Sequence, residues 1–294
     1  MKRTKQLSKK VHGIFTGDWH GREDQPICRT DDFQKAQWAK ISFINDLQRK
    51  YNCPVLHSGD LFNHWKPSPY LLSKIIELIP DKFITNFGNH DLPQHALELA
   101  YKCGVNTLLQ AEKIILFTGT HWGQEPRGRS YFDSVYNRSI LVWHVMTWTG
   151  SLPWPGCIDI PAEKILEKYQ EYDLILTGHN HKSFVVEQDG RLLVNPGSLT
   201  RQKADQEEHE PCVYLWHAED NTVTKVILPF EKDVISREHI EKIQKRDDRI
   251  MAFIEKLCDD WETGISFEDN MERFLATNTV RKSVIQIIQE ALDQ

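Results

Sequence analysis

Residues 11–21 read VHGIFTGDWHG, an apolar run that stops at a glycine and continues directly into polar residues. The run predicts a buried β-strand, and Asp18 and His20 stand two residues apart where that strand ends. Residues 53–59 (CPVLHSG) and 82–88 (KFITNFG) repeat the arrangement, each ending at a glycine before a polar side chain. A turn after a strand needs glycine or asparagine, but it needs no carboxylate and imidazole, so these segments predict more than a change of chain direction.

Predicted helices separate these three strands. Apolar residues recur at every third or fourth position within residues 31–50, which is the period of an amphipathic helix. Residues 69–79 and 94–101 are predicted as two further helices. Strands that alternate with helices indicate an α/β core in which crossover helices connect neighbouring strands.

After about residue 112 the pattern changes to short strand-like runs. Turn sequences such as Asp189-Gly190 separate several of them, and one predicted helix, residues 162–170, interrupts the series. The runs cover residues 113–118, 131–136, 139–144, 174–177, 183–187, 192–194, 212–217 and 222–228. Together the two halves predict two sheets packed face to face with helices outside.

From about residue 236 the sequence is helical, with apolar side chains at helical spacing and few strand-forming residues. We therefore predict a main domain over residues 1–232 and a small C-terminal helical appendage over residues 233–294. The apolar face of the appendage either docks a partner protein or packs onto the main domain.

The composition is ordinary for a globular enzyme, with 294 residues of which 40% are hydrophobic and 27% charged. A net charge of −6 gives no sign of a protein that coats nucleic acid by bulk basicity. The six cysteines are scattered without a Cys-x-x-Cys pair, which favours a reduced, cytoplasmic chain. No apolar stretch is long enough for a signal peptide or a membrane span, so no membrane partner is expected.

Polar residues at five predicted strand ends supply a mixed set of oxygen and nitrogen donors. They are Asp18 with His20, Asp60, Asn89 with His90, His144, and His179 with His181. The carboxyl ends of strands in an open α/β sheet gather at one edge, so these side chains are predicted to converge. In D-x-H and H-x-H on extended backbone both side chains point the same way, so one ion can bind both. The donor set has no thiolate and suits Mn²⁺, Fe or Zn²⁺.

These motifs resemble the complete motif set of the calcineurin-like metallophosphoesterases over about residues 11–200. The resemblance implies a four-layer αββα sandwich with two divalent metal ions, Mn²⁺ being the first choice and Fe, Zn²⁺ and Mg²⁺ the alternatives. It implies that Asp18, His20 and His181 hold one ion, that Asn89, His144 and His179 hold the other, and that Asp60 bridges them. Two such cations lower the pKa of a shared water and clamp phosphoryl oxygens, so phosphate-ester hydrolysis is the expected reaction.

Within that superfamily the sequence is most similar to the SbcD-type nucleases of double-strand-break repair. The similarity rests on GDLFNHWKPSPYLL (59–72), GNHD (88–91) and NPGSLTRQ (195–202). It implies DNA as the substrate, an SbcC-type ATPase as a partner of the terminal helices, and a homodimer as an option. Much of the capping region of cellular members is missing, which fits a compact phage-encoded member. Asn63 stands where Asp or His is frequent, so the sequence does not separate exonuclease from endonuclease.

His90 and Asp91 are the predicted catalytic residues beside Asn89. His90 lies one residue beyond a ligand, so we expect it to face away from that ion and to reach the leaving-group oxygen. Proton donation there is typically worth about 10²- to 10⁴-fold in rate. Asp91 either orients His90 or caps the helix that follows, and the sequence favours neither role.

Four further residues are candidates for substrate contact: His64, Trp148, Trp154 and Arg201. His64 follows the motif of Asp60 and is a candidate for a phosphate contact. The two tryptophans lie in a loop after the histidine motif at 144. They either stack on nucleobases, at about 1–3 kcal/mol per base, or pack a proline-rich loop. Arg201 follows a glycine turn and is the preferred phosphate contact there.

Two alternatives to a DNA nuclease stay open at this point. One is a phosphodiesterase for a small nucleotide or a phospholipid headgroup, and the other is a metal-binding scaffold that recruits an ATPase with weak catalysis.

Overall fold

The computed structural model describes residues 9–117, 120–126, 137–259 and 266–277, together with 279–282, 284, 285 and 288. The chain forms two compact units, Met1–Ser236 and Arg237–Gln294. The strand predicted at 131–136 lies outside the described residues.

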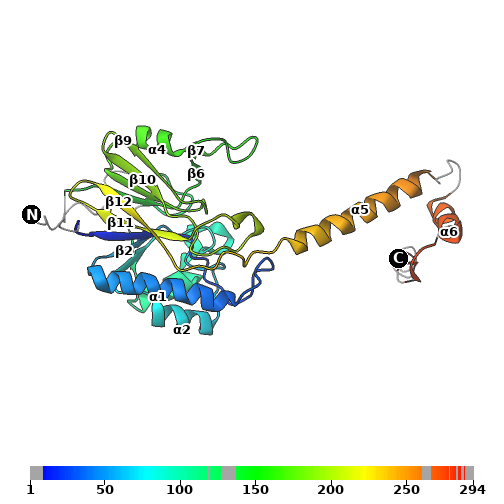
Figure 1. Ribbon diagram of the computed structural model, residues 1–294, viewed down its shortest axis with the longest axis horizontal. Coiled ribbons are helices and arrows are strands. Elements are labelled where there is room, and N and C mark those ends of the chain that lie inside the picture. The colour runs from blue at the N-terminus through cyan, green and yellow to red at the C-terminus, as the bar shows by residue number, and fades with distance from the viewer. Residues whose placement is uncertain are drawn as a thin grey trace, which may run out of the picture. The chain divides into compact units, whose positions relative to one another are not determined.

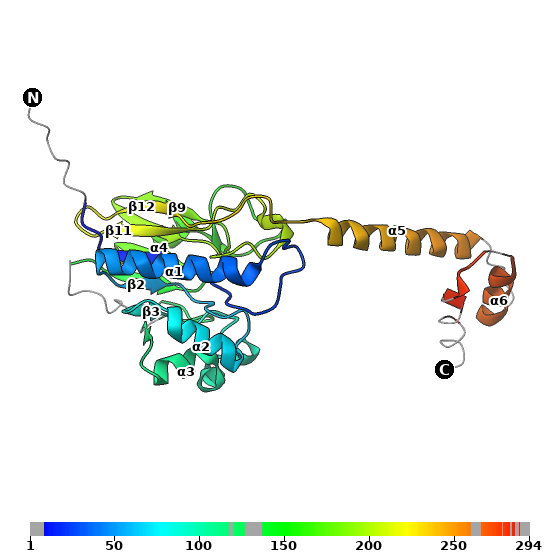
Figure 2. The same ribbon diagram turned by 60° about the horizontal axis from the view of Figure 1, so that its bottom comes forward.

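The first sheet has six strands in the order β12-β11-β1-β2-β3-β4 (Figure 1). Its parallel part is β1 (Gly13–Thr16), β2 (Val55–His57), β3 (Phe83–Thr85) and β4 (Ile115–Leu116), and β11 (Cys212–His217) and β12 (Thr222–Ile227) extend it as antiparallel neighbours. The helices on its outer face are α1 (Phe33–Tyr51), α2 (Pro69–Leu78) and α3 (Gly104–Gln110), which lie together beside β2 and β3 in Figure 2.

Helices α1 and α2 begin at side-chain caps. The carboxylate of Asp32 accepts a hydrogen bond from the backbone N–H of Lys35 (2.9 Å), and the hydroxyl of Ser68 accepts one from the backbone N–H of Leu71 (3.1 Å). These side chains satisfy N–H groups that have no partner within the helix. The predicted helices at 31–50 and 69–79 are thereby confirmed to within two residues at each end.

The second sheet has the order β5-β8-β10-β9. Its strands are β5 (Ile140–Trp143), β8 (Leu174–Thr177), β9 (Phe184–Gln188) and β10 (Arg191–Asn195). Asp189 and Gly190 join β9 to β10 with φ of 52° and 73°, the left-handed conformations that a two-residue hairpin turn of this kind requires. Helix α4 (Ala162–Lys168) packs on this sheet, and β6 (Thr147–Trp148) and β7 (Ile160–Pro161) form a small separate pair.

Successive residues of the strands point into different apolar layers. Ile14 packs in the layer under α1 and α2, whereas Phe15 packs in the layer between the two sheets. In the second sheet Val142 faces that middle layer and Leu141 faces α4. The structure therefore confirms the four-layer αββα sandwich, with the core divided into three apolar layers.

The helix predicted at 94–101 is wrong. The chain instead makes two short 3₁₀ turns, η1 (Pro93–His95) and η2 (Leu97–Lys102), and then α3. Gln94 and His95 have φ of 54° and 57°, so the backbone leaves the right-handed helical region directly after Pro93. A third 3₁₀ turn, η3 (Ala204–Gln206), precedes β11.

The second unit contains α5 (Glu238–Asp259) and α6 (Phe267–Thr277), so its helical character is confirmed where the chain is described. In the same described ranges, no helix is both long enough and apolar enough to cross a membrane.

Candidate metal centre

The predicted ligands converge at one edge of the sandwich, as the strand ends indicated. Three of them follow β1, β2 and β3 of the first sheet, namely Asp18, Asp60 and Asn89. His144 follows β5 and His179 follows β8 of the second sheet. Nitrogen and oxygen atoms from both sheets thus meet within hydrogen-bonding distance.

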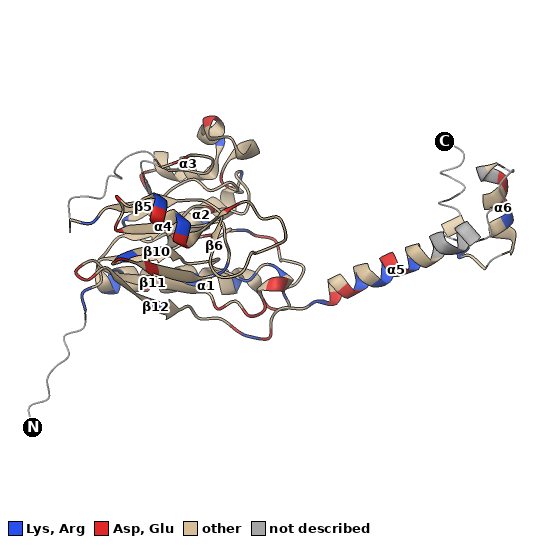
Figure 3. Cartoon of the chain, turned by 90° about the horizontal axis from the view of Figure 1, so that it is seen from above, with Lys and Arg blue, Asp and Glu red and all other residues tan. Residues whose placement is uncertain are grey.

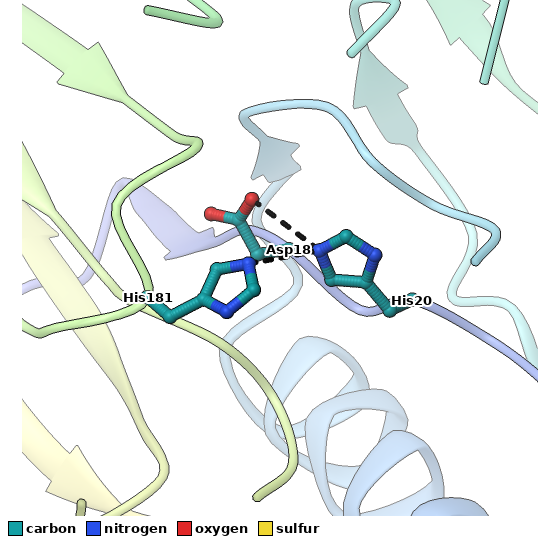
Figure 4. A group of neighbouring side chains, drawn as sticks. All are labelled: Asp18, His20 and His181. Atoms are coloured by element: carbon teal, nitrogen blue, oxygen red, sulfur yellow. Dashed lines mark hydrogen bonds and ion pairs between the residues drawn. The ribbon is translucent and has the colours of Figure 1, made fainter. Parts of the chain in front are cut away.

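Asp18, His20 and His181 form the first cluster of candidate ligands, and Figure 4 shows their side chains turned toward one another. Nε2 of His20 lies 3.0 Å from Nε2 of His181 and 3.9 Å from Oδ1 of Asp18. The backbone N–H of His179 donates to both carboxylate oxygens of Asp18, at 3.0 and 3.1 Å. That pair of bonds fixes the carboxylate relative to the loop after β8.

The second cluster contains Asp60, His144 and His179, with Asn89 among them. Oδ1 of Asn89 lies 3.1 Å from Nε2 of His144 and 2.9 Å from Nδ1 of His179. Oδ2 of Asp60 lies 3.4 Å from Nε2 of His144 and 3.5 Å from Nε2 of His20. Asp60 therefore reaches both clusters.

The hydrogen bond on the far side of the His144 ring fixes its orientation. Nδ1 donates to the backbone carbonyl of Ser58 at 2.7 Å, so Nε2 is turned toward Asn89 and Asp60. A metal-binding histidine characteristically donates its second ring N–H in this way. The arrangement therefore fits a cation between the side chains.

The loops that carry the ligands adopt unusual backbone conformations. Asp18, His20, Asp60 and His179 all have positive φ, at 47°, 45°, 56° and 75°. Non-glycine residues rarely adopt this region, and such residues gather where a site demands a particular geometry. The position of Gly88 also requires glycine, because a Cβ there would lie 2.7 Å from Cγ of Asp60.

Burial and neighbouring charges decide the protonation of the clusters. Burial raises the pKa of Asp18 to about 8. Burial opposes ionisation of Asp60 as well, but His144, followed by His20 and His90, favours the charged carboxylate, and together these histidines hold the pKa of Asp60 well below its usual range. Burial lowers the pKa of His179 and of His181 to about 4, so both rings keep a lone pair at neutral pH. Bound divalent cations would supply the positive charge that these buried carboxylates need, so the donor set fits such ions.

His90 lies beside candidate ligands of the first cluster and the shared carboxylate. One of its ring nitrogens lies within 4.8 Å of ligand atoms of His20 and Asp60, and its ring meets that of His20 at a centroid distance of 4.7 Å. Nδ1 donates to the backbone carbonyl of Asn63 at 2.9 Å. This bond leaves Nε2 as the nitrogen that is free to act toward the clusters.

Asp91 has neither of the two roles considered for it. Its buried carboxylate accepts backbone N–H groups from Gly88 (3.0 Å), Phe62 (3.1 Å) and Leu61 (3.3 Å). Burial, helped by the charge of Asp60, raises the pKa of Asp91 to about 7. Asp91 therefore joins the loop after β2 to the loop after β3 and positions the residues that carry ligands.

The predicted substrate residues are not all brought to the clusters. Trp154 is 48% exposed and lines the same cavity as the clusters. Trp148 is half-buried, and its Nε1 donates to the carbonyl of Asp159 at 3.3 Å, which fits the loop-packing alternative. His64 is exposed and lies outside that cavity lining, and its Nδ1 accepts from the backbone N–H of Lys66.

Arg201 lines the cavity but is only 2% exposed. Its guanidinium donates to the backbone carbonyls of Glu207 (2.9 Å) and Glu231, and it lies over the ring of Phe230. These contacts favour a structural role over the predicted phosphate contact.

Two residues that contact the candidate ligands were not predicted from the sequence to support them. His95 donates from Nδ1 to the backbone carbonyl of Asn89 at 2.9 Å, and Trp122 stacks on His179 with ring centroids 4.9 Å apart. Neither residue belongs to a motif that carries a ligand. Their proximity arises from the packing of loops that are distant in the sequence, and no local pattern signals it.

A cavity of about 1020 Å³ contains the clusters and extends beyond them. Its lining includes Asp60, His90, His179 and His181. Charged side chains of both signs line the rest: Lys182, Lys203, Lys225 and Lys232, and Asp205, Glu207, Glu208, Glu210 and Asp233. Ligands of a size well beyond a single phosphate fit this space.

Four layers of helix and sheet, with oxygen and nitrogen donors gathered at the strand ends, define a sandwich of the metal-dependent phosphatase type. A family model described as a calcineurin-like phosphoesterase superfamily domain matches residues 14–221. The chain belongs to that superfamily. Membership and the candidate metal-ligand clusters together support a hydrolase of phosphate esters.

Three solved structures are similar to this chain at low identity. An archaeal phosphodiesterase is 17% identical, with a TM-score of 0.42, over 74% of this chain and 99% of its own. Zinc-bound Vps29 from Entamoeba histolytica is 14% identical, with a TM-score of 0.35, over 74% and 99%. Vacuolar protein sorting 29 from Cryptosporidium parvum is 17% identical, with a TM-score of 0.37, over 76% and 100%. No functional conclusion follows from similarity at this level.

Proposed function

We propose that this protein is a two-metal-dependent phosphodiesterase that hydrolyses DNA, as SbcD-type nucleases do in repair or recombination. The observation that carries the proposal is the position of Asp60, whose Oδ2 lies 3.5 Å from Nε2 of His20 and 3.4 Å from Nε2 of His144. A carboxylate shared between two donor clusters suits a pair of ions about 3.5–4 Å apart.

In this proposal each ion takes ligands from both sheets. Asp18, His20 and His181 would hold one ion, Asn89, His144 and His179 would hold the other, and Asp60 would be shared between them. When bound, two such ions supply a water of lowered pKa and positive charge for the phosphoryl oxygens. Oxygen and imidazole donors without thiolate favour Mn²⁺, with Fe, Zn²⁺ and Mg²⁺ as alternatives.

His90 is the proposed proton donor to the leaving 3′-oxygen. Its Nδ1–H is committed to the carbonyl of Asn63, so the protonated ring presents Nε2–H on the side of the clusters. The ring is exposed, which leaves room for a substrate atom beside it. A sugar alkoxide is a poor leaving group, so a donor here contributes directly to the rate.

Support for DNA as the substrate comes from the SbcD-like segments and from the lysines of the cavity. Lys182, Lys203 and Lys232 are exposed in its lining, and none of them forms an ion pair with any described residue. Three free ammonium groups near a two-metal centre suit a chain of phosphates better than a single phosphate. The carboxylates of the same lining weaken the overall field, so binding depends on local contacts.

The proposal includes an SbcC-type ATPase as partner of α5. Ile240, Ile243 and Ile250 are 39%, 48% and 48% exposed, at spacings of three and seven residues that place them on one face of the helix. Acidic and basic side chains occupy other positions of α5 (Figure 3). Changing Ile243 and Ile250 to Asp should abolish ATPase binding, whereas the charge change Lys245→Asp should not. Equal binding by all variants would remove α5 from the interface.

One set of assays tests the reaction. Linear single- and double-stranded DNA and bis-p-nitrophenyl phosphate are incubated with Mn²⁺ and the wild type, Asp60→Asn, or Asp189→Asn, the last in the β9–β10 turn. We expect wild type and Asp189→Asn to cleave all substrates, and Asp60→Asn to lose more than about 100-fold on each, since even supporting residues of a metal site cost 10- to 100-fold.

The failures of this assay are distinguishable. Full activity of Asp60→Asn would exclude the shared carboxylate. Hydrolysis of the small ester without cleavage of DNA, even with an SbcC-type ATPase present, would favour a small nucleotide or phospholipid headgroup as substrate. ATPase binding without hydrolysis of any ester would favour the scaffold alternative.

A further inference from the structure

Trp122 contacts two candidate ligands, His144 and His179, which belong to the same cluster. Its ring stacks on the imidazole of His179, with centroids 4.9 Å apart and an interplanar angle of 28°. It meets the ring of His144 edge-on at 5.9 Å and 67°. Among the described aromatic rings, it makes no such contact with His20 or His181.

The loop around Trp122 is anchored to both halves of the sandwich. The backbone N–H of Trp122 donates to the carbonyl of Phe87 at 3.0 Å, one residue before Gly88. The side chain of Asn86 donates to the carbonyl of Thr120 at 2.9 Å, and Nε1 of Trp143 donates to the carbonyl of Gln124 at 3.0 Å. The indole is therefore held in place by the backbone of the site and not by its side-chain packing alone.

The indole of Trp122 covers one face of the His179 ring. Nδ1 of His179 lies 2.9 Å from Oδ1 of Asn89, so the nitrogen edge of the ring points into the cluster while the indole covers a ring face. An imidazole that binds a cation carries partial positive charge, and the electron-rich face of an indole stabilises positive charge. The stacking is therefore stronger when an ion is bound than when it is not.

We propose that Trp122 is a positioning residue that sets the affinity of one ion, the one held by Asn89, His144 and His179. The ion held by Asp18, His20 and His181 binds independently of Trp122. This inference rests on the two-metal site of the proposed function and adds a difference between its two halves. Supporting residues of metal sites typically change affinity by about 10- to 100-fold.

Calorimetric titration of the full chain with MnCl₂, without any substrate, tests the inference. Wild type should bind two ions. Trp122→Ala should bind one ion with unchanged affinity and the other about 10- to 100-fold more weakly. Trp122→Phe keeps an aromatic face and should restore most of the loss, whereas Trp122→Leu fills space without that face and should not. Trp38→Ala removes a half-buried indole from α1 and should bind both ions normally.

Each other outcome has a defined meaning. If wild type binds two ions and Trp122→Ala also binds both tightly, the inference is overturned and the two-metal site stands. Equal weakening of both ions, or Trp122→Leu binding like wild type, overturns it as well. If Trp122→Ala does not fold, the comparison of Phe with Leu at this position decides. If wild type itself binds fewer than two ions, the two-metal site fails and the inference with it.

Discussion

Replacing Gly88 by alanine should displace the shared carboxylate of the metal centre. A Cβ at this position would lie 2.7 Å from Cγ of Asp60 and closer still to its Oδ1 and backbone nitrogen. Carbon atoms pack at about 3.5–4.0 Å, so Asp60 or the loop after β3 must move by roughly 1 Å. Gly88 is not among the residues with positive φ, so the backbone accepts alanine and the contact alone produces the effect.

The size of the effect follows from that displacement. A misplacement of about 1 Å in a group that positions a reaction costs about 10²-fold in rate. Overpacking of a buried site costs about 1–3 kcal/mol of unfolding free energy. We expect Gly88→Ala to hydrolyse bis-p-nitrophenyl phosphate about 100-fold more slowly and to bind fewer than two Mn²⁺ ions, because Asp60 no longer lies between both clusters.

Gly190→Ala is the matched control. It lies in the β9–β10 turn with φ of 73°, and a Cβ there meets nothing within 4 Å. The left-handed backbone makes this variant less stable by roughly 1–2 kcal/mol, similar to the loss expected for Gly88→Ala, but its activity and metal content should equal those of wild type. If Gly88→Ala also keeps two ions and the wild-type rate, the reasoning about Asp60 is refuted.

Three further predictions concern other parts of the molecule. His90→Ala should lower kcat on DNA by about 10²- to 10⁴-fold but affect bis-p-nitrophenyl phosphate much less, because p-nitrophenolate leaves without a proton; equal losses would contradict a proton donor. Lys203→Gln should make the slope of log K against log salt shallower by about 0.7 for single-stranded DNA, and an unchanged slope would exclude this phosphate contact. Burial lowers the pKa of Lys40 from 10.5 to about 8, so between these values the unfolded chain binds a proton that the folded chain does not. The unfolding free energy of wild type, measured in urea, should therefore rise with pH over that window relative to Lys40→Met, and parallel pH profiles would disprove the assignment.

The sequence predicted most of the elements that carry ligands, because their signals are local. The apolar runs at 53–59 and 82–88 contain β2 and β3, and the periodic segment at 31–50 contains all of α1 but its last residue, Tyr51. The convergence of donors followed from a general rule about strand ends, since the carboxyl ends of parallel strands meet at one edge. The sequence therefore predicted which loops carry the candidate ligands and that these loops lie at one edge of the sandwich.

The misses concern contacts between segments that are distant in the sequence. Asp91 bonds to backbone N–H groups of Leu61 and Phe62, some thirty positions earlier, and a sequence pattern does not encode such partners. Trp122 owes its role to a stacking contact with His179, on a loop of the other sheet. The helix predicted at 94–101 failed because Gln94 and His95 adopt positive φ, a conformation imposed by the loop and not by their own propensities.

The two clusters also have a mechanical meaning, because each draws side chains from both sheets. Asp18 follows β1 and His181 follows β8, while Asn89 follows β3 and His144 follows β5. Ions bound there would act as cross-links between two sheets that also pack through the apolar middle layer and share hydrogen bonds such as that from His179 to Asp18. An ion at 100 times its dissociation constant stabilises the folded state by about 2.7 kcal/mol, so a chelator should lower the melting temperature. Loss of metal would then weaken the packing between the two sheets at this edge, so the side chains that bind the ions would also stabilise the fold.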